Sequence, residues 1–564
     1  MEEVRRSANL GASIWDDDHI QSLTSLYTGE KYVAEAEKLK NLVKIMIDET
    51  EDELDQLELI DSLQRLGLCN HFEDRIAKML DNIYEAEKCR DDENMEKNLH
   101  ITALRFRLLR QHGYHVPQEI FCSFMDDVGN FKASVCEDVR GVVSLYEASY
   151  LSVEGESLLD LAKDFSLNNL TRRIDKITEP RLAEQVKHAL EVPRHWRVQR
   201  LEAKWYIQAY ESRSSANLIL VELAKLDFNM VQATHQQELK RISRWYKETG
   251  LPEKLGFARH RLAECFLWAL GFAPKPHFGF SREILIKTGQ LITIIDDMYD
   301  VYGTLEELQL FTNTIERWDI NSLDNLPEYM RICFLAIFNF SNELAYHILR
   351  DQGFNVIPNM RKLWAELCRA YYLEARWFHS GYVPTTNEYL NTAWISISGP
   401  LLLFYAYFST NAINNEELQS LEQYPGIIRW PSTVLRLTDD LGTSSVRKLY
   451  TYIRQYKQSL IIVIIKQDEM KRGDVPKSVQ CYMIETGCSE EDARKHIKHL
   501  IEAALKRMNK EILMEKPLKD FSHIAMNLGR ISLCMYQHGD GYGLPHSETK
   551  RNLVSLIVQP FPMP

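Results

Sequence analysis

Hydrophobic residues recur at helical spacing along nearly the whole chain. Within residues 35–47, Leu39, Leu42, Val43 and Met46 lie three or four positions apart among charged residues, so they share one face of an amphipathic helix. The same spacing is found in four further segments, residues 53–66, 74–84, 218–226 and 328–348. The sequence has no series of alternating apolar and polar positions joined by Asn-Gly or Asp-Gly turns. The pattern predicts an all-α protein.

Interruptions of this pattern indicate two helical domains. Pro193, the polar residues 211–216 and Gly250 cluster around the end of the first two-fifths of the chain, and such residues end helices. We place the domain boundary near residue 215, which gives an N-terminal domain over residues 1–215 and a C-terminal domain over residues 216–564. A chain of 564 residues and 65.9 kDa is also too long for one ordinary core.

Composition narrows the class of protein. The formal charge of −13 disfavours a protein that binds the nucleic-acid backbone. The ten cysteines form no CxxC pair, which indicates reduced thiols in an intracellular compartment and no zinc site. No apolar run approaches the roughly 20 residues that span a bilayer, so we expect no transmembrane segment. The first residues match neither a secretory signal nor a transit peptide, so we expect a cytoplasmic protein unless a plastid leader is missing from this sequence.

Three carboxylates end an apolar helix that the pattern predicts over residues 291–300. Asp296 and Asp300 are four residues apart and share a face, with Asp297 beside them. Like charges this close repel one another unless a cation neutralises them, and oxygen ligands favour magnesium or a similar hard ion. A solvated helix end would show the same spacing, so the motif alone leaves both interpretations open.

A second apolar segment also ends in acids and favours the metal interpretation. Asp439 and Thr443 are four residues apart, and two such segments could hold divalent ions between facing helices. Arg259 and Arg261 precede the first motif, and Arg436 lies one helical turn before Asp439. Acids together with guanidinium groups indicate a polyanion bridged through metal, and a diphosphate fits this description best.

These motifs together resemble those of plant class I terpene synthases. The matching features are DDMYD at 296–300, the pair Arg259 and Arg261, LRLTDDLGTS at 435–444, and Arg5-Arg6 followed by Trp15. The similarity runs nearly end to end, and the tandem arginines with RGDVPKS at 472–478 are most similar to the angiosperm monoterpene synthase branch. The resemblance implies an α-barrel-like, structural N-terminal domain and a catalytic class I terpenoid synthase α-bundle.

The resemblance also implies a role for each motif residue. Magnesium, with manganese as an alternative, would be bound by Asp296, Asp300, Asp439, Thr443 and Glu469, with Asp297 in support. The diphosphate would be bound by Arg259, Arg261, Arg436 and Lys477. The walls of the substrate pocket would include Trp268, Tyr371 and Tyr536, although core aromatics would look the same in sequence. A lid and an N-terminal cap would include Arg5, Arg6, Trp15, Asp540 and Tyr542; an ordinary surface loop and an exposed arm are the alternatives.

The second metal motif departs from the family pattern. The family continues with an acid four residues after the threonine, where this chain has Arg447. Excising residues 446–467 would bring Glu469 to the eighth position after Asp439 and complete the motif. The excised stretch has five basic residues, no acid and a Leu-Ile-Ile-Val-Ile-Ile run that favours strand. Our hypothesis is an unspliced intron read in frame; the alternative is a surface loop that lets Glu469 return to the metals.

We expect a magnesium-dependent terpene synthase that ionises geranyl diphosphate and forms a monoterpene, and we favour a cyclic product over an acyclic one. A cytosolic sesquiterpene synthase acting on farnesyl diphosphate is the first alternative, and a chain-elongating prenyltransferase shares the same aspartate chemistry. A weakly active or inactive prenyl-diphosphate binder would result if Glu469 cannot reach the metals. The expected partner is a small prenyl diphosphate, in a monomer or homodimer without nucleic acid.

Overall fold

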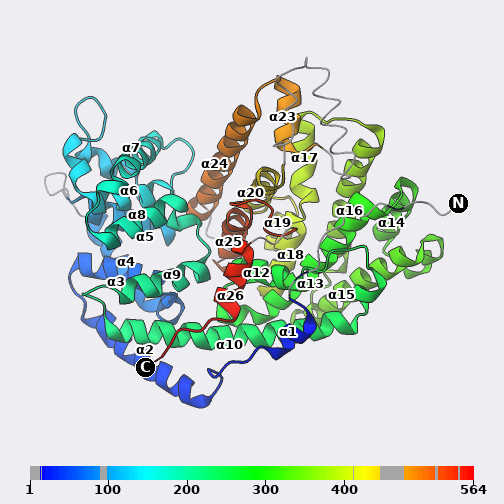
Figure 1. The fold of residues 1–564 in the computed structure, drawn as a ribbon, viewed down its shortest axis with the longest axis horizontal. Coiled ribbons are helices and arrows are strands. Elements are labelled where there is room, and N and C mark those ends of the chain that lie inside the picture. The colour runs from blue at the N-terminus through cyan, green and yellow to red at the C-terminus, as the bar shows by residue number, and fades with distance from the viewer. Residues whose placement is uncertain are drawn as a thin grey trace. The chain divides into compact units, whose positions relative to one another are not determined.

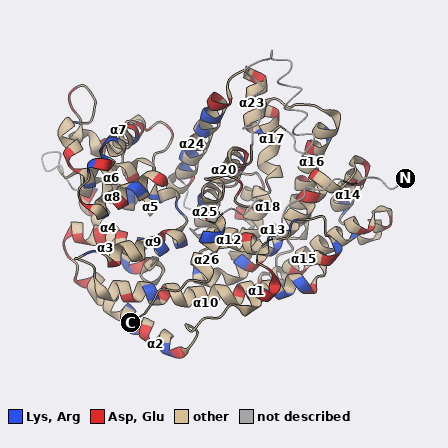
Figure 2. Ribbon diagram, in the orientation of Figure 1, with Lys and Arg blue, Asp and Glu red and all other residues tan. Residues whose placement is uncertain are grey.

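The structure, a computed structural model, describes residues 5, 13, 15–88, 98–410, 412–444, 476–514, 519–543 and 547–563. All regular elements in these residues are helices, and the only extended pairing among them is an isolated bridge between Met125 and Phe131 (Figure 1). The all-α prediction is therefore confirmed. Figure 2 shows Lys and Arg interspersed with Asp and Glu along most of the helices.

Contacts between Cα atoms divide the chain into two compact units. The first unit comprises Met1–Leu23, Gln237–Leu505 and Leu518–Leu553, and the second comprises Thr24–Gln236, Lys506–Pro517 and Val554–Pro564. The change from one unit to the other at Gln237 falls inside the long helix α10 (Leu218–Glu248). The sequence boundary near residue 215 lies in the turn before this helix and stays a prediction.

The second unit is built mainly from amphipathic helices, around one helix that is buried on all faces over residues 102–110. Its helices are α2 (Glu30–Glu49), α3 (Glu53–Arg65), α4 (Glu73–Lys88), α5 (Leu99–Gln111), α6 (Val139–Ser149), α7 (Ser157–Arg173), α8 (Pro180–Glu191) and α9 (Gln199–Glu211). Helix α6 packs against α5, α7 and α8. In α2 the buried face is Ala36, Leu39, Val43 and Ile47, whereas Leu42 is 40% exposed. The predicted helix is therefore confirmed, but its buried stripe is displaced from the predicted one.

The first unit contains the helices that surround the candidate site. They are α1 (Asp17–Ser22), α11 (Leu251–Lys254), α12 (Leu262–Phe272), α13 (Gly279–Asp297), α14 (Leu305–Arg317), α15 (Glu328–Gln352), α16 (Ile357–Ser380), α17 (Thr386–Ser396), α18 (Gly399–Thr410), α19 (Asn415–Leu421), α20 (Gly426–Thr443), α23 (Ser478–Thr486) and α25 (Lys519–Tyr536). Helices α12, α13, α18, α20 and α25 pack against one another. Helices α12 and α18 are apolar on nearly all faces, which explains why they are buried here.

The remaining helices complete the chain. Helices α24 (Glu490–Met514) and α26 (Ser547–Ile557) contribute residues to both units, as α10 does. Short 3-10 helices span Cys69–His71, Gln118–Phe124, Ala133–Glu137, Ile174–Lys176, Arg194–Trp196, Pro276–Phe278 and Ile320–Asn325.

Helix α15 is the one helix in the described ranges that is long and apolar enough to cross a membrane. Only length and composition support that role, and 44% of its apolar window is buried in the protein. The helix packs against α13, α14 and α16. A core helix passes the same test, so this is weak evidence against the prediction of no transmembrane segment.

A buried ion pair joins the start of α13 to α10. Arg282 is 0% exposed and donates to Glu238 Oε2 from Nε (2.8 Å) and to Glu238 Oε1 from Nη2 (2.7 Å). It also donates to the carbonyls of Ala273, Lys275 and Pro276, which lie between α12 and α13. The pair therefore fixes the direction in which α13 enters the site.

Replacing this arginine tests its contribution to stability. We expect Arg282→Leu to lower the free energy of unfolding by about 3–5 kcal/mol, because Glu238 would keep a buried charge without its partner. The measurement is urea denaturation followed by circular dichroism. Arg241→Leu is the matched control, since its pair with Glu283 is 51% exposed on the arginine side and should contribute about 1 kcal/mol or less. Equal losses from both variants would contradict the prediction.

Candidate active site

A single cavity in the first unit collects most of the predicted site residues. Its volume is about 760 Å³, and its walls come mainly from α12, α13, α16, α20 and α25. The predicted residues that line it are Asp296, Asp297, Asp300, Asp439, Thr443, Arg259, Arg436, Lys477, Trp268, Tyr371, Tyr536, Asp540 and Tyr542. Arg261, Arg5 and Trp15 are not among the lining residues, and Arg6, Glu469 and residues 446–467 lie outside the described residues.

The first acidic motif is not a regular α-helix throughout. Helix α13 ends at Asp297, and one π-helical turn over Met298–Tyr302 carries Asp300. This turn is closed by a hydrogen bond from the Gly303 N–H to the Met298 carbonyl (2.8 Å). The α-helical spacing assumed from the sequence is therefore wrong at Asp300. Both Asp296 and Asp300 nevertheless line the cavity, and single π-turns are frequent at functional sites.

Arg259 pairs with the first two carboxylates of this motif. Its Nη2 lies 2.5 Å from Asp296 Oδ2, and its Nε lies 2.8 Å from Asp297 Oδ1. The Arg259 backbone N–H also donates to Asp297 Oδ2 (2.6 Å). Burial raises the pKa of Asp297 to about 6, against the opposing effect of the Arg259 guanidinium. Asp297 therefore holds the loop that carries Arg259, and its role in support of a metal site stays a prediction.

Gln290 is a site residue that the sequence reasoning missed. Its Oε1 accepts from the Arg261 N–H (3.0 Å), and its Nε2 donates to the Arg259 carbonyl (3.0 Å). It is 0% exposed and lies two helical turns before Asp297. The sequence did carry a signal for Gln290, because it is a polar residue within an apolar helix that ends in a carboxylate.

Arg261 lies behind the cavity wall. Its side chain is 2% exposed, and its Nη2 donates to the carbonyl of Gly543 (3.1 Å). This contact supports the turn after Asp540, whose Oδ1 accepts from the N–H groups of Tyr542 (3.1 Å) and Gly543 (2.7 Å). The diphosphate-binding role of Arg261 stays a prediction, and its position here favours support of the C-terminal loop.

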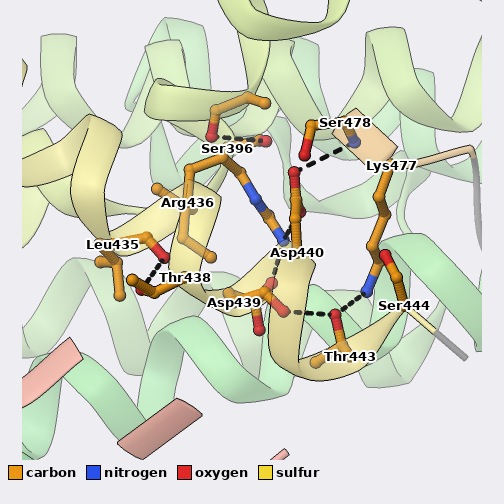
Figure 3. Close-up of polar contacts among 12 residues, drawn as sticks. Ser396, Leu435, Arg436, Thr438, Asp439, Asp440, Thr443, Ser444, Lys477 and Ser478 are labelled. Carbon is orange, nitrogen blue, oxygen red and sulfur yellow. Dashed lines mark hydrogen bonds and ion pairs between the residues drawn. The ribbon is translucent and has the colours of Figure 1, made fainter. Parts of the chain in front are cut away.

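The second acidic motif lies at the end of α20 (Figure 3). Arg436 forms an ion pair with Asp439, one turn later in the same helix. Thr443 Oγ1 donates to the Asp439 carbonyl (2.7 Å) and accepts from Lys477 Nζ (2.8 Å). Lys477 immediately precedes α23, and its side chain extends from there to the acidic motif.

The oxygen-rich end of the cavity fits divalent ions together with an anion. Asp296, Asp300, Asp439 and Thr443 offer hard oxygen ligands, although the described part of the chain contains no group of three acidic, His or Cys residues already gathered as a metal cluster. The Arg436 Nε is buried and has no hydrogen-bond partner within those residues. A buried donor beside carboxylates is what a metal-bridged diphosphate would require.

Part of the cavity wall is aromatic. The rings of Trp268 and Tyr536 lie 6.0 Å apart, and those of Tyr299 and Tyr371 lie 5.4 Å apart. Gly289 also lines this part, and a Cβ there would meet Cys265 Sγ at an ordinary 3.4 Å. The wall therefore combines aromatic rings with a position that has no side chain.

Tyr542 closes the wall between α12 and α13. Its hydroxyl lies 2.5 Å from Thr293 Oγ1 and 3.1 Å from Cys265 Sγ. Burial raises the pKa of the Cys265 thiol to about 12, so the thiol is neutral. The sequence did not indicate Thr293 or Cys265, because their partner lies far along the chain.

A break between α17 and α18 also faces the cavity. Ile397 and Ser398 line it, and Ser398 has a left-handed backbone (φ 65°). Glu374 accepts a hydrogen bond from Ser396 Oγ (2.6 Å), and burial raises the pKa of Glu374 to about 7. The C-terminus of a helix carries partial negative charge, so the end of α17 at Ser396 favours a cation nearby.

The N-terminal arm is described at few positions, and one of them, Arg5, contacts the end of the π-helical turn and the helix that follows it. Arg5 donates to Glu307 Oε1 (2.8 Å) and Oε2 (2.9 Å) and to the Tyr302 carbonyl (3.1 Å). Its guanidinium lies 4.7 Å from the Tyr302 ring centroid and 5.0 Å from that of Tyr329. Against the effect of burial, the Arg5 guanidinium holds the pKa of Glu307 down at about 2. Trp15 is buried, 5.0 Å from the His19 ring. The cap role of both residues stays a prediction.

Two family models match most of the chain. The model described as "Terpene synthase family, metal binding domain" matches residues 247–456 and 462–507, and "Terpene synthase, N-terminal domain" matches residues 14–190. The unmatched residues 457–461 lie within the segment 446–467.

Relatives and solved structures are similar over the full length. An exo-alpha-bergamotene synthase of Lavandula angustifolia is 68% identical over 563 residues, covering 100% of both chains. A trans-alpha-bergamotene synthase of Phyla dulcis is 63% identical and covers 99% of both, and a (-)-alpha-terpineol synthase of Vitis vinifera is 52% identical over 99% of this chain and 91% of its own.

Two solved structures share the fold. Limonene synthase with 2-fluorolinalyl diphosphate is 42% identical, with a TM-score of 0.92 and coverage of 99% of this chain and 100% of its own. Isoprene synthase from grey poplar leaves, in complex with three Mg²⁺ ions and dimethylallyl-S-thiolodiphosphate, is 43% identical. Its TM-score is 0.85, with coverage of 97% of this chain and 99% of its own.

Proposed function

Because the chain belongs to the terpene synthase family, whose members are lyases acting on prenyl diphosphates, we propose that it converts farnesyl diphosphate to a cyclic sesquiterpene of the bergamotene type. The observation that carries the choice of substrate is the 68% and 63% identity, over the full length, to two bergamotene synthases. The proposal departs from the geranyl diphosphate that the motifs alone favour. A cytoplasmic location accompanies the proposed substrate.

Geranyl diphosphate is the second candidate, with a monoterpene as product and the plastid as location. The tandem Arg5-Arg6 followed by Trp15 supports it, and so does the 42% identity to limonene synthase over nearly the whole chain. The cavity of about 760 Å³ lies within the range of roughly 300–1,000 Å³ that small-molecule sites occupy.

The polar end of the cavity would carry out the ionisation. Asp296, Asp300, Asp439 and Thr443 would hold magnesium ions, which, when bound, neutralise the charge that develops on the diphosphate. Arg259, Arg436 and Lys477 would bind the diphosphate oxygens. The carbon–oxygen bond breaks with both electrons leaving on the diphosphate, which leaves an allylic cation in the prenyl chain.

The rest of the cavity would protect and shape that cation. The faces of Trp268, Tyr371 and Tyr536 offer negative π density without a basic group that could take a proton early. The end of α17 at Ser396 adds partial negative charge. Tyr542 closes the wall, so that water is kept from the reactive carbon.

Product analysis tests the proposal. The full chain and a variant lacking residues 446–467 are each incubated with farnesyl and geranyl diphosphates, with magnesium or with EDTA, and the products are identified by gas chromatography–mass spectrometry. We expect magnesium-dependent fifteen-carbon hydrocarbons with a bergamotene skeleton from farnesyl diphosphate. Exclusive turnover of geranyl diphosphate would establish the second candidate instead, and no turnover by either folded protein would overturn both.

A further inference from the structure

Asp440 is a buried carboxylate next to the second acidic motif that does not line the cavity. It is 0% exposed, and its Oδ1 lies 2.7 Å from the Arg436 Nη2. The same oxygen accepts from the Tyr389 hydroxyl (2.9 Å), and its Oδ2 accepts from the Ser478 backbone N–H (3.2 Å). Figure 3 shows this carboxylate between Arg436 and Ser478. One side chain therefore connects α20, α17 and the start of α23.

The contact with Ser478 determines where Lys477 lies. Ser478 is the first residue of α23, and a carboxylate at a helix N-terminus is favourable because the exposed N–H groups carry partial positive charge. Lys477 immediately precedes that helix, and its ammonium group contacts Thr443. An anchored helix start thus holds a cation against the acidic motif.

Further contacts hold the same two segments together from the other side. Arg494 in α24 donates to the carbonyls of Leu441 (2.9 Å) and Ser444 (2.6 Å), in the last turn and at the C-cap of α20, where carbonyls have no partner within the helix. Ser444 Oγ also donates to Gln480 Oε1 in α23 (3.3 Å). The end of α20 and the start of α23 are therefore joined by several contacts among the described residues.

We infer that Asp440 is a positioning residue that places the cationic groups of Arg436 and Lys477 at the diphosphate end of the cavity. This inference rests on the proposed function, since it requires that a diphosphate be the ligand there. Asp440 acts on one cation directly, through the ion pair, and on the other indirectly, through the Ser478 N–H. It touches neither substrate nor metal in this role.

Substitution of the carboxylate by an amide tests the inference. In the full chain, Asp440→Asn is expected to raise the KM for the prenyl diphosphate and the inhibition constant of inorganic diphosphate with magnesium by about 10-fold each, because the ion pair is lost. The fall in kcat should be smaller, about 3-fold or less. Tyr389→Phe is the matched control: it removes one hydrogen bond from the same carboxylate and should leave KM within about 2-fold.

A second pair of variants isolates the contact with α23. Ser478→Pro removes the N–H that Asp440 accepts, at the first position of a helix, where proline is well tolerated. Ser478→Ala removes the hydroxyl and keeps that N–H. We expect the proline variant alone to raise the inhibition constant of diphosphate by about 5-fold, because one hydrogen bond is lost.

The outcomes separate this inference from the proposed function. Calorimetric titration of the unmodified chain with magnesium and inorganic diphosphate must show binding, and a failure there would overturn the proposed function itself. If the unmodified chain binds and Asp440→Asn binds equally well, only the positioning role is overturned. If Asp440→Asn loses thermal stability but keeps its KM and its inhibition constant for diphosphate, the carboxylate has only a structural role, and the positioning role is again overturned. If Asp440→Asn does not fold, the test rests on the two Ser478 variants. Equal inhibition constants of diphosphate for Ser478→Pro and Ser478→Ala would then contradict the inference.

Discussion

The Asp296→Asn variant is expected to lower kcat/KM for the prenyl diphosphate by about 10³-fold, which corresponds to about 4 kcal/mol of lost transition-state stabilisation. Asp296 lines the polar end of the cavity and is paired with Arg259 at 2.5 Å. An amide offers one neutral oxygen where the carboxylate offers two charged ones, so a divalent ion would be held weakly at the site where charge develops on the leaving group.

Steady-state kinetics at saturating magnesium measures this effect. Glu306→Gln is the matched control, because Glu306 lies shortly after the same motif but is exposed, and its variant should stay within about 2-fold. A titration with magnesium should show that Asp296→Asn requires a higher concentration for half-maximal activity. Activity within 10-fold of the unmodified chain would contradict the metal-ligand role of Asp296.

Deletion of residues 446–467 is expected to raise kcat/KM by about 100-fold or more, since it supplies an additional carboxylate ligand to the second motif. The deletion brings Glu469 to the eighth position after Asp439, and in a helix residues eight apart drift by only about 80°. The ends that the shorter connection must join, Ser444 and Lys477, are already held together by side-chain contacts. A shorter connection also lowers the entropy cost of closure by about 1 kcal/mol.

The control for the deletion removes the ligand that it restores. Glu469→Gln placed in the deletion variant should return the activity to about that of the full chain, whereas Glu469→Gln in the full chain should change it little. Equal activity of the full chain and the deletion variant would show that the segment is a tolerated loop. Sequencing of mature transcripts tests the origin of the segment, because codons for residues 446–467 in every transcript would contradict the intron hypothesis.

Helical spacing predicted elements better than it predicted which face is buried. In α2 the helix is present, and Leu39 and Val43 are buried as expected. Leu42 is 40% exposed, while Ala36 and Ile47 are buried instead. Neighbouring stripes on a helix satisfy the same three-to-four spacing, so the choice between them is made by the packing partner, which a single segment does not reveal.

In the candidate site, residues that belong to a short sequence motif were predicted, whereas residues whose partners lie far away in the sequence were missed. The motifs carry their chemistry within a few residues of sequence, so most of their residues could be found there. The predicted residues Asp296, Asp300, Asp439, Arg259, Arg436 and Lys477 do line one cavity. Gln290 and Asp440 were missed because their partners come from other segments: the loop before α12 for Gln290, and α17 and α23 for Asp440. The π-turn that carries Asp300 depends on backbone hydrogen bonds, for which the side-chain pattern gives no signal.

Gly289 has a consequence for how this protein could diversify after gene duplication. Gly289 lines the cavity, and no carboxylate or arginine lies within 4 Å of the position that its Cβ would take. A methyl group there would meet only the Cys265 side chain, at ordinary contact distance, so an alanine can be introduced without displacing the backbone. Because the contour of the wall decides how a carbocation folds, we expect a single nucleotide change from glycine to alanine at this codon to alter the proportions of the terpene products while the ligands of the metal and the diphosphate stay in place. New products can therefore arise here without an inactive intermediate.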